Sequence, residues 1–308
     1  MHPDLPRLLQ LFYNTAWAVR PDFLVTMQTV LDRWATGVKL SPADIQAAVG
    51  TAPADAQQRR QSRGPGAIGV LPIYGLISHR AHVVQNISGP GGTSTELVSR
   101  ELRRLMADDA VGAIVLDIDS PGGNVHGVQE LADEIHSYRG KKKIVAHANA
   151  TSASGAYWLA AACDEIIVTP SGEVGSVGVF CAHEDKSEFL KSQGRTISYV
   201  QAGKYKTEGN SAGPLDEEAR AYLQAMVDEM YGVFTKSLAK FRDIDVATVR
   251  STYGEGRMVM AAEALKRGMV DRIETFDDTL ARLARTTQAQ KPRARGTRAE
   301  RLRLAETG

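Results

Sequence analysis

Between Gly66 and residue 201, short apolar runs alternate with longer segments whose apolar residues recur every three or four positions. The short runs are typical of buried strands, and the longer segments are typical of amphipathic helices. The predicted strands cover residues 67–77, 112–118, 143–149, 165–170, 174–180 and 196–201. The predicted helices cover residues 95–108, 125–139, 154–163 and 185–194. Because such strands usually lie in a sheet covered on both faces, the pattern predicts a largely parallel α/β sheet.

The flanking parts of the chain are patterned differently. Residues 1–50 show helical spacing, for example in RPDFLVTMQTVLDRWATG, and predict a small helical N-terminal appendage. Residues 51–65 are polar and contain Pro and Gly, which predicts a linker. After residue 215, apolar residues keep a three/four spacing that predicts one long helix. The tail 286–308 is basic and predicts a solvated, poorly ordered end.

Composition narrows the class of protein. The chain has 37 Lys and Arg against 36 Asp and Glu, so its net charge does not indicate a nucleic-acid or membrane partner. An anionic partner such as nucleic acid is an alternative only for the basic tail, which is otherwise expected to be solvated. The two cysteines, Cys163 and Cys181, are too few for a disulfide framework and suit a reducing compartment. No run reaches about 18 apolar residues, and the first residues lack the cationic start of a signal peptide. We therefore expect a cytoplasmic protein without a membrane partner.

The stretch SASGAYW raises the question of whether Ser154 is a helix cap or a nucleophile. Ser154 follows a predicted strand and starts a predicted helix. The first N–H groups of a helix have no partner within it, so the Gly155 N–H could stabilise an oxyanion formed by attack of Ser154. Serine is equally a preferred N-cap residue. Taken alone, the stretch favours the cap.

The stretch DIDSPGGN closes a second predicted strand. Gly122 and Gly123 allow positive φ and a close approach of backbone to a ligand. Such a turn can direct a backbone N–H into a cleft as an oxyanion donor. A simple tight turn between strand and helix explains the same residues.

A nucleophilic serine needs a general base, and the sequence offers two. The loop AGKYKTEGNSAGP carries Lys204 and Lys206, and a lysine removed from water can lose its proton and act as a base. His183, with Asp185 two residues later, could instead complete a Ser–His–Asp set. The residues alone leave both bases open.

Five stretches in order, GVLPIYGLI, DIDSPGGNV, SASGAYWLA, GSVGV and GKYK, resemble the signal peptide peptidase A family of serine–lysine peptidases. The resemblance covers about residues 66–275. It implies a peptidase domain at 66–285 with an α/β fold of the ClpP/crotonase-like type, built from repeated strand–helix units. It implies Ser154 as the nucleophile, Lys206 as the general base and Ser176 as the residue that orients the lysine.

The resemblance also implies an oxyanion hole formed by Gly155 and Gly123, with Gly122 as the less favoured donor. Lys204 stays a rival to Lys206. His183 as the base would instead indicate a ClpP-type triad. No metal or cofactor is expected, since the sequence shows no metal site and GPGG at 89–92 lacks the Lys-Ser/Thr that follows a phosphate-binding loop.

Within the family, IGVLPIYGLISHR, GSVGVFCAHED and KYKTEGN are similar to the phage head-maturation (procapsid) proteases. This implies polypeptide substrates such as scaffold, portal-associated or self segments, a place in the procapsid or host cytoplasm, and a homo-oligomer. SASGAYW is closer to the cellular peptidases, so a cellular cytoplasmic signal-peptide-peptidase-like protease is the alternative. Two further alternatives are a crotonase-type acyl-CoA enzyme and a capsid-associated structural protein with a decayed site.

Overall fold

The computed structural model describes residues 13, 15–23, 66–80 and 92–289. The strands are β1 (Trp17–Val19), β2 (Ala67–Tyr74), β3 (Ile77–Ser78), β4 (Thr93–Ser94), β5 (Val111–Ser120), β6 (Gly122–Asn124), β7 (Lys143–Ala153), β8 (Glu165–Val168), β9 (Glu173–Gly175), β10 (Met258–Met260) and β11 (Arg272–Ile273). The helices are α5 (Thr95–Ala107), α6 (Val128–Ser137), α7 (Gly155–Ala161), α8 (Ser187–Ser192), α9 (Glu217–Arg242), α10 (Val246–Thr252), α11 (Ala261–Lys266) and α12 (Phe276–Ala289).

The main sheet is parallel except at one edge. Its strands follow the order β10-β9-β7-β5-β2, and β8 pairs with β7 on one side and β11 on the other. All these pairs are parallel apart from the antiparallel pair β10–β9. The prediction of a largely parallel α/β sheet is confirmed.

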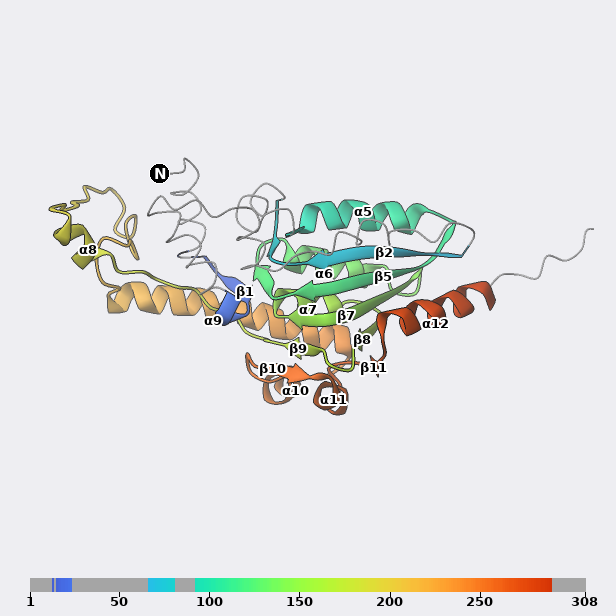
Figure 1. Ribbon diagram of the computed structural model, residues 1–308. Coiled ribbons are helices and arrows are strands. Elements are labelled where there is room, and N and C mark those ends of the chain that lie inside the picture. The colour runs from blue at the N-terminus through green and yellow to red at the C-terminus, as the bar shows by residue number, and fades with distance from the viewer. Residues whose placement is uncertain (1–12, 14, 24–65, 81–91, 290–308) are drawn as a thin grey trace, which may run out of the picture.

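Helices cover both faces of this sheet (Figure 1). Side chains such as Ile114 and Leu116 of β5 face a large core that also includes residues of α5, α6, α7 and α9. The alternate β5 residues Ala113 and Val115 face a second core formed with α12. Because consecutive side chains of a strand point to opposite faces, an uninterrupted apolar strand is what a sheet with two covered faces requires.

A smaller sheet lies beside the main one, in the order β1-β6-β3-β4. Its strand β6 follows β5 after a single residue, Pro121, so the end of the main sheet continues directly into the small one. β1 pairs with β6 in antiparallel fashion, although more than 100 residues separate them. The small sheet therefore brings an N-terminal segment against the Pro-Gly-Gly turn.

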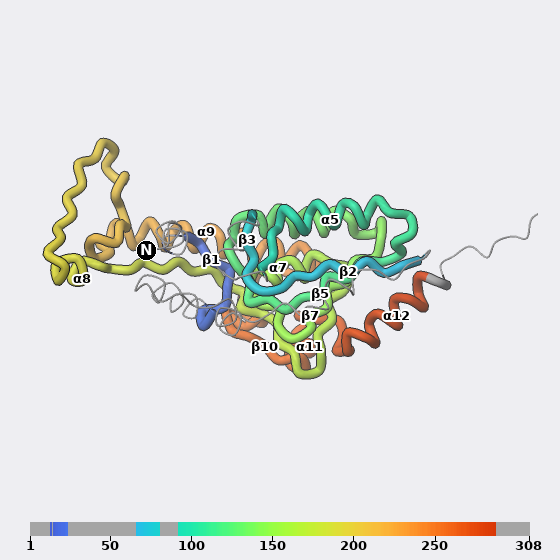
Figure 2. The backbone as a smooth tube through the Cα atoms, turned by 45° about the horizontal axis from the view of Figure 1, so that its top comes forward, coloured from blue at the N-terminus to red at the C-terminus, as the bar shows by residue number. Residues whose placement is uncertain are grey.

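Residues 181–216 and the first half of α9 extend away from the body, and we call them the arm (Figures 1 and 2). The C-terminal half of α9 is anchored in the main core by Phe234, Leu238 and Phe241. Residues 193–206 of the arm are all exposed. The arm thus consists of the first half of α9 and a loop that carries α8. The helix is held to the body through its C-terminal half, and the loop lies beside its N-terminal half.

Several predicted elements differ in the structure. The strand predicted at 196–201 is wrong: this segment is irregular and exposed along its length, because no sheet edge lies beside it to pair with. The strand predicted at 174–180 ends at Gly175, where the chain leaves the sheet. Within the predicted helical appendage 1–50, residues 17–19 form the strand β1. Residues 24–65 and the tail 290–308 lie outside the described residues.

Candidate active site

Ser154 stands at the junction of β7 and α7. It has φ 53° and ψ −116°, a backbone conformation that non-glycine residues rarely adopt. Its N–H donates to the Gly175 carbonyl at 2.7 Å, and its Oγ donates to the Gly178 carbonyl at 3.3 Å. Although Ser154 occupies the N-cap position of α7, its hydroxyl makes no capping hydrogen bond. The cap therefore does not explain this serine.

The helix that follows Ser154 is rigidly held. All seven residues of α7 are buried. Trp158 stacks on Phe234 of α9, with ring centroids 4.4 Å apart, and the Tyr157 hydroxyl donates to the Met269 carbonyl at 2.7 Å. Because the first N–H groups of a helix have no partner within it, α7 presents fixed donors beside Ser154.

The Pro-Gly-Gly turn packs directly against this helix start. Gly122 has φ 96°, and a Cβ there would lie 2.9 Å from the Ala153 carbonyl oxygen and 3.0 Å from the Gly155 nitrogen. A Cβ at Gly123 would lie 1.9 Å from the Ile77 carbonyl oxygen. Only glycine lets the two backbones approach this closely.

The two expected oxyanion donors lie side by side. A Cβ built on Gly155 would lie 3.5 Å from the Gly123 nitrogen. The Gly122 N–H already donates to the Ser120 Oγ at 3.1 Å, and that hydroxyl donates to the Gly75 carbonyl at 2.6 Å. Gly122 is thereby committed to holding the turn, which favours Gly123 as the donor of the pair.

Ser176 lies beside Ser154 through the pairing of β7 with β9. The register sets Ala153 opposite Gly175 in a parallel pair, so the residues that follow, Ser154 and Ser176, leave the sheet together. Ser176 is nearly buried, has φ 51° and donates its N–H to the Arg257 carbonyl at 2.8 Å. The structure brings together Ser154, Ser176 and the glycine pair.

The structure does not bring Lys206 of the same chain to this group of residues. Lys206 is exposed on the loop of the arm, and its ammonium has no ion pair or hydrogen bond to any described residue. Lys204 differs, because its Nζ contacts Glu218 at 2.7 Å and the Tyr205 hydroxyl at 3.0 Å. The hydrogen bond to Glu218 raises the pKa of Lys204, which favours its protonated form.

His183 is also separated from Ser154. Its Nε2 lies 3.3 Å from the Gly213 carbonyl oxygen, in the loop that precedes α9. Asp185 accepts a hydrogen bond from the Ser187 N–H at 2.9 Å, at the start of α8. Among the described residues, no hydrogen bond joins His183 to Asp185 or to Ser154, so the structure contains no assembled Ser–His–Asp set.

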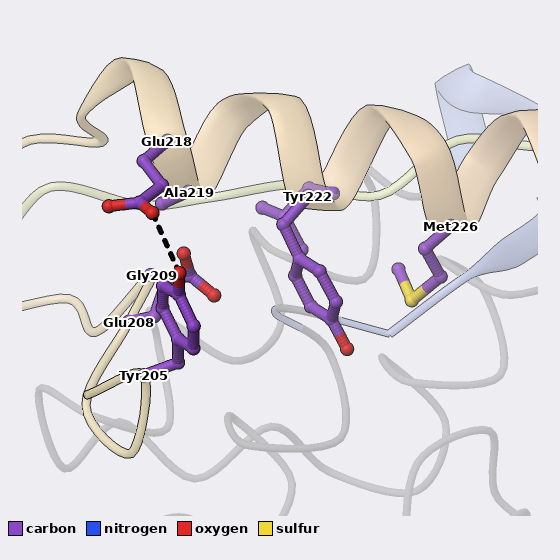
Figure 3. A pocket seen from close by; sticks show the side chains of 8 residues that line it. Tyr205, Glu208, Gly209, Glu218, Ala219, Tyr222 and Met226 are labelled. Atoms are coloured by element: carbon purple, nitrogen blue, oxygen red, sulfur yellow. Dashed lines mark hydrogen bonds between the residues drawn. The ribbon is translucent and has the colours of Figure 1, made fainter. Parts of the chain in front are cut away.

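A pocket of about 660 Å³ opens between the arm loop and α9 (Figure 3). Its wall includes Tyr205 and Glu218, joined by a hydrogen bond of 2.9 Å, and Met226 at the end nearer the body. Ser154, Ser176 and the glycine pair do not line it. The described residues also contain no group of His, Cys, Asp and Glu able to hold a metal, and no helix among them has the length and apolar character to cross a membrane.

Sequence reasoning missed β1 as part of this site. The segment TAWAVR carries no strand signal longer than its three paired residues, and its partner β6 lies far along the chain. The Gly178 carbonyl, which accepts from Ser154, was likewise not identifiable, because a backbone acceptor has no sequence signature.

Known proteins resemble this chain over most of its length. It is 31% identical to the head-tail preconnector protein GP5 of Enterobacteria phage P21 over 225 residues, which is 73% of this chain and 44% of that protein. It is 30% identical to the capsid assembly protease C of Escherichia phage lambda over 242 residues, or 79% of this chain and 54% of that protein. Protease 4 of Haemophilus influenzae is 24% identical over 70% of this chain and 34% of its own length. The chain spans about half the length of the two phage relatives.

Residues 136–290, half of the chain, match the sequence profile of peptidase family S49. This span contains Ser154 and Ser176 together with Lys206, while the glycine turn lies just before it. The parallel sheet with repeated strand–helix units agrees with the ClpP/crotonase-like fold expected from the resemblance. The fold, the resemblance and the profile agree, and the chain belongs to peptidase family S49.

Proposed function

We propose that this protein is a serine endopeptidase that works through a Ser154–Lys206 dyad and an acyl-enzyme. The observation that carries the proposal is Ser154 itself: a serine with a strained backbone, whose hydroxyl does not cap its helix and which lies beside the Gly155 and Gly123 backbone. Strained residues of this kind concentrate at functional sites.

The reaction has two steps. Neutral Lys206 takes the proton from Ser154 Oγ as the oxygen attacks the scissile carbonyl carbon. The N–H groups of Gly155 and Gly123 donate to the oxyanion, and the lysine then gives its proton to the leaving amine. Water attacks the resulting ester with Lys206 again as the base, which releases the acid and regenerates Ser154. Ser176 orients the lysine ammonium.

The position of Lys206 supports a dyad formed between two copies of the chain. Lys206 lies on the exposed arm loop, whereas Ser154 is buried in the body. We therefore place Lys206 in the site of a neighbouring copy within a homo-oligomer. The arm is suited to this, since it extends beyond the body and ends in an exposed loop (Figure 2).

The test combines two inactive variants. Removal of a general base typically costs roughly 10²–10⁴-fold in rate, so Lys206→Ala and Ser154→Ala should each lose activity on a peptide substrate. Lys206→Arg should be inactive too, because a guanidinium keeps its proton. If the arm acts on a neighbour, mixing Ser154→Ala with Lys206→Ala and allowing the copies to exchange should restore part of the activity.

Lys204→Ala is the matched control, since Lys204 lies on the same loop and is paired with Glu218. It should stay active. An active Lys206→Ala enzyme would exclude the dyad. Two inactive variants whose mixture stays inactive would place both groups in one chain.

For the biological role, we propose maturation of a phage procapsid, with scaffold, portal-associated or self segments as substrates. The support is the similarity to a capsid assembly protease and a head-tail preconnector protein. Co-expression with neighbouring head genes should give cleavages that Ser154→Ala abolishes. Products that stay uncut with the active enzyme would contradict this role and favour the cellular alternative.

A further inference from the structure

β1 lies across the candidate active site, where the arm joins the body (Figures 1 and 2). Residues 16–19 are each at most 4% exposed. On one side β1 pairs with β6, the strand of the oxyanion turn. On the other side Trp17 and Phe180 exchange two backbone hydrogen bonds, of 2.8 and 3.1 Å. The segment is therefore held as a strand between the two chain segments that border Ser154.

The register pairs Ala18 with Gly123. Two residues away on either side, backbone hydrogen bonds join the pairs of the same ladder. The Arg20 N–H donates to the Pro121 carbonyl at 2.9 Å, and the Val125 N–H donates to the Ala16 carbonyl at 3.4 Å. Because hydrogen-bonded pairs alternate along an antiparallel ladder, Ala18 and Gly123 are the hydrogen-bonded pair between them. A Cβ on Gly155 would lie 3.2 Å from the Ala18 oxygen. The Ala18 carbonyl thus lies next to both proposed oxyanion donors.

The side chains of β1 show what this groove accepts. Ala16 and Ala18 point to the same face of the strand, since they are two residues apart. Both are buried in a small apolar cluster whose other members are Val125, Val179, Met226 and Met230. Apolar side chains of this cluster pack against both positions, so a long or charged side chain there would have to displace neighbouring residues.

We infer that residues 16–18 occupy the acyl side of the substrate groove, with the Ala18–Val19 peptide bond facing Ser154. The groove accepts extended segments with small side chains at the positions of Ala16 and Ala18. In the resting chain β1 competes with substrates for this site. The inference rests on the proposed function, because it assigns the groove beside Ser154 to a peptide substrate.

The test measures binding without catalysis. A fluorescein-labelled peptide of residues 13–20 is titrated with full-length protein carrying Ser154→Ala, and its anisotropy is followed. A second substitution in this Ser154→Ala protein, Ala18→Asp, should expel β1 from the groove, because the β1 position would otherwise bury a charge in an apolar cluster. The peptide should then bind at least about tenfold more tightly, the factor expected when β1 leaves the groove free only about a tenth of the time.

Two controls make the outcome decisive. Pro21→Ala, at an exposed position just after β1, should bind the peptide as the parent does. A peptide with Asp in place of Ala18 should not bind the opened protein. If Ala18→Asp fails to fold, Arg20→Ala takes its place. It removes ion pairs of 2.6 Å to Glu173 and 2.7 Å to Asp22 and should loosen β1 to a smaller degree.

Equal peptide binding by the parent and by a folded Ala18→Asp protein would overturn the inference. So would equal binding of the two peptides. The proposed function is read separately, from labelling of Ser154 by a fluorophosphonate in proteins that retain the serine. Peptide binding by the opened Ser154→Ala protein, together with no labelling of an Ala18→Asp protein that retains Ser154, would support the groove and contradict the peptidase chemistry.

Discussion

Ser154 holds a backbone conformation that costs stability. Its φ of 53° and ψ of −116° suit glycine better than any residue with a Cβ, and such strain costs on the order of 1–3 kcal/mol. The hydrogen bonds around it, including the one from its N–H to Gly175, hold it there. The strained geometry turns the hydroxyl away from the helix that it would otherwise cap.

At this residue we predict that Ser154→Gly and Ser154→Ala are both inactive but differ in stability. The alanine variant keeps the strained Cβ and loses only the hydroxyl, whereas glycine also relieves the strain. The free energy of unfolding should be about 1 kcal/mol or more higher for Ser154→Gly than for Ser154→Ala, measured by urea denaturation. A glycine variant that is less stable than the alanine variant would show that the site is not strained.

At the scale of elements, α12 covers the second face of the sheet through contacts with β7. His147 of β7 is buried, its Nδ1 lies 3.1 Å from the Thr279 hydroxyl, and its ring packs edge-on against Phe276. Its Nε2 has no hydrogen-bond partner among the described residues. Burial lowers the pKa of His147 from 6.5 to about 4; the charge of Glu274 raises this pKa to a smaller extent, and the charge of Arg282 lowers it further.

This burial predicts a loss of stability in acid. The unfolded chain takes up a proton at His147 below about pH 6.5, whereas the folded chain does so only near pH 4. The free energy of unfolding should therefore fall between these values, by about 2 kcal/mol at pH 5 relative to pH 7.5 from this residue alone. In urea denaturation, His147→Gln should lack this component. Identical pH dependence of the two proteins would contradict the assignment.

At the scale of the whole molecule, the arm carries most of the exposed apolar side chains. Six of the nine large exposed hydrophobic residues of the described chain lie between residues 187 and 222. Phe189 is 64% exposed and Val200 is fully exposed. Apolar residues gathered on a projecting element are typical of a surface that packs against another protein.

We predict that Phe189→Asp and Val200→Asp reduce self-association. Wild-type protein should sediment as an oligomer, and these variants should shift toward the 33.3 kDa monomer and lose peptidase activity. Their thermal unfolding should change little, because neither residue contributes to the core. Leu97→Asp, at an exposed position on α5, is the matched control and should still assemble. A wild-type protein that sediments as a monomer would remove the prediction.

Local pattern was sufficient to predict the architecture and to place candidate site residues at the ends of strands. The apolar runs of β5 and β7 predicted a sheet covered on both faces, because burial on two sides leaves no room for alternating polar residues. The glycines after β5 and the serine after β7 lie at strand ends in the sequence itself. Parallel strands align such ends at one edge of the sheet, so Gly123 and Ser154 meet for a reason that the sequence contains.

Only the tertiary structure decided the rest. The segment 196–201 has strand-like residues but no strand, since a strand requires a neighbouring edge that is formed elsewhere in the chain. β1 has almost no strand signal and is one, because β6 and Phe180 supply its partners. The same holds for Lys206, whose distance from Ser154 depends on the direction in which α9 carries the arm. Spacing along the sequence determines which residues share a face, whereas contacts between distant segments determine which faces meet.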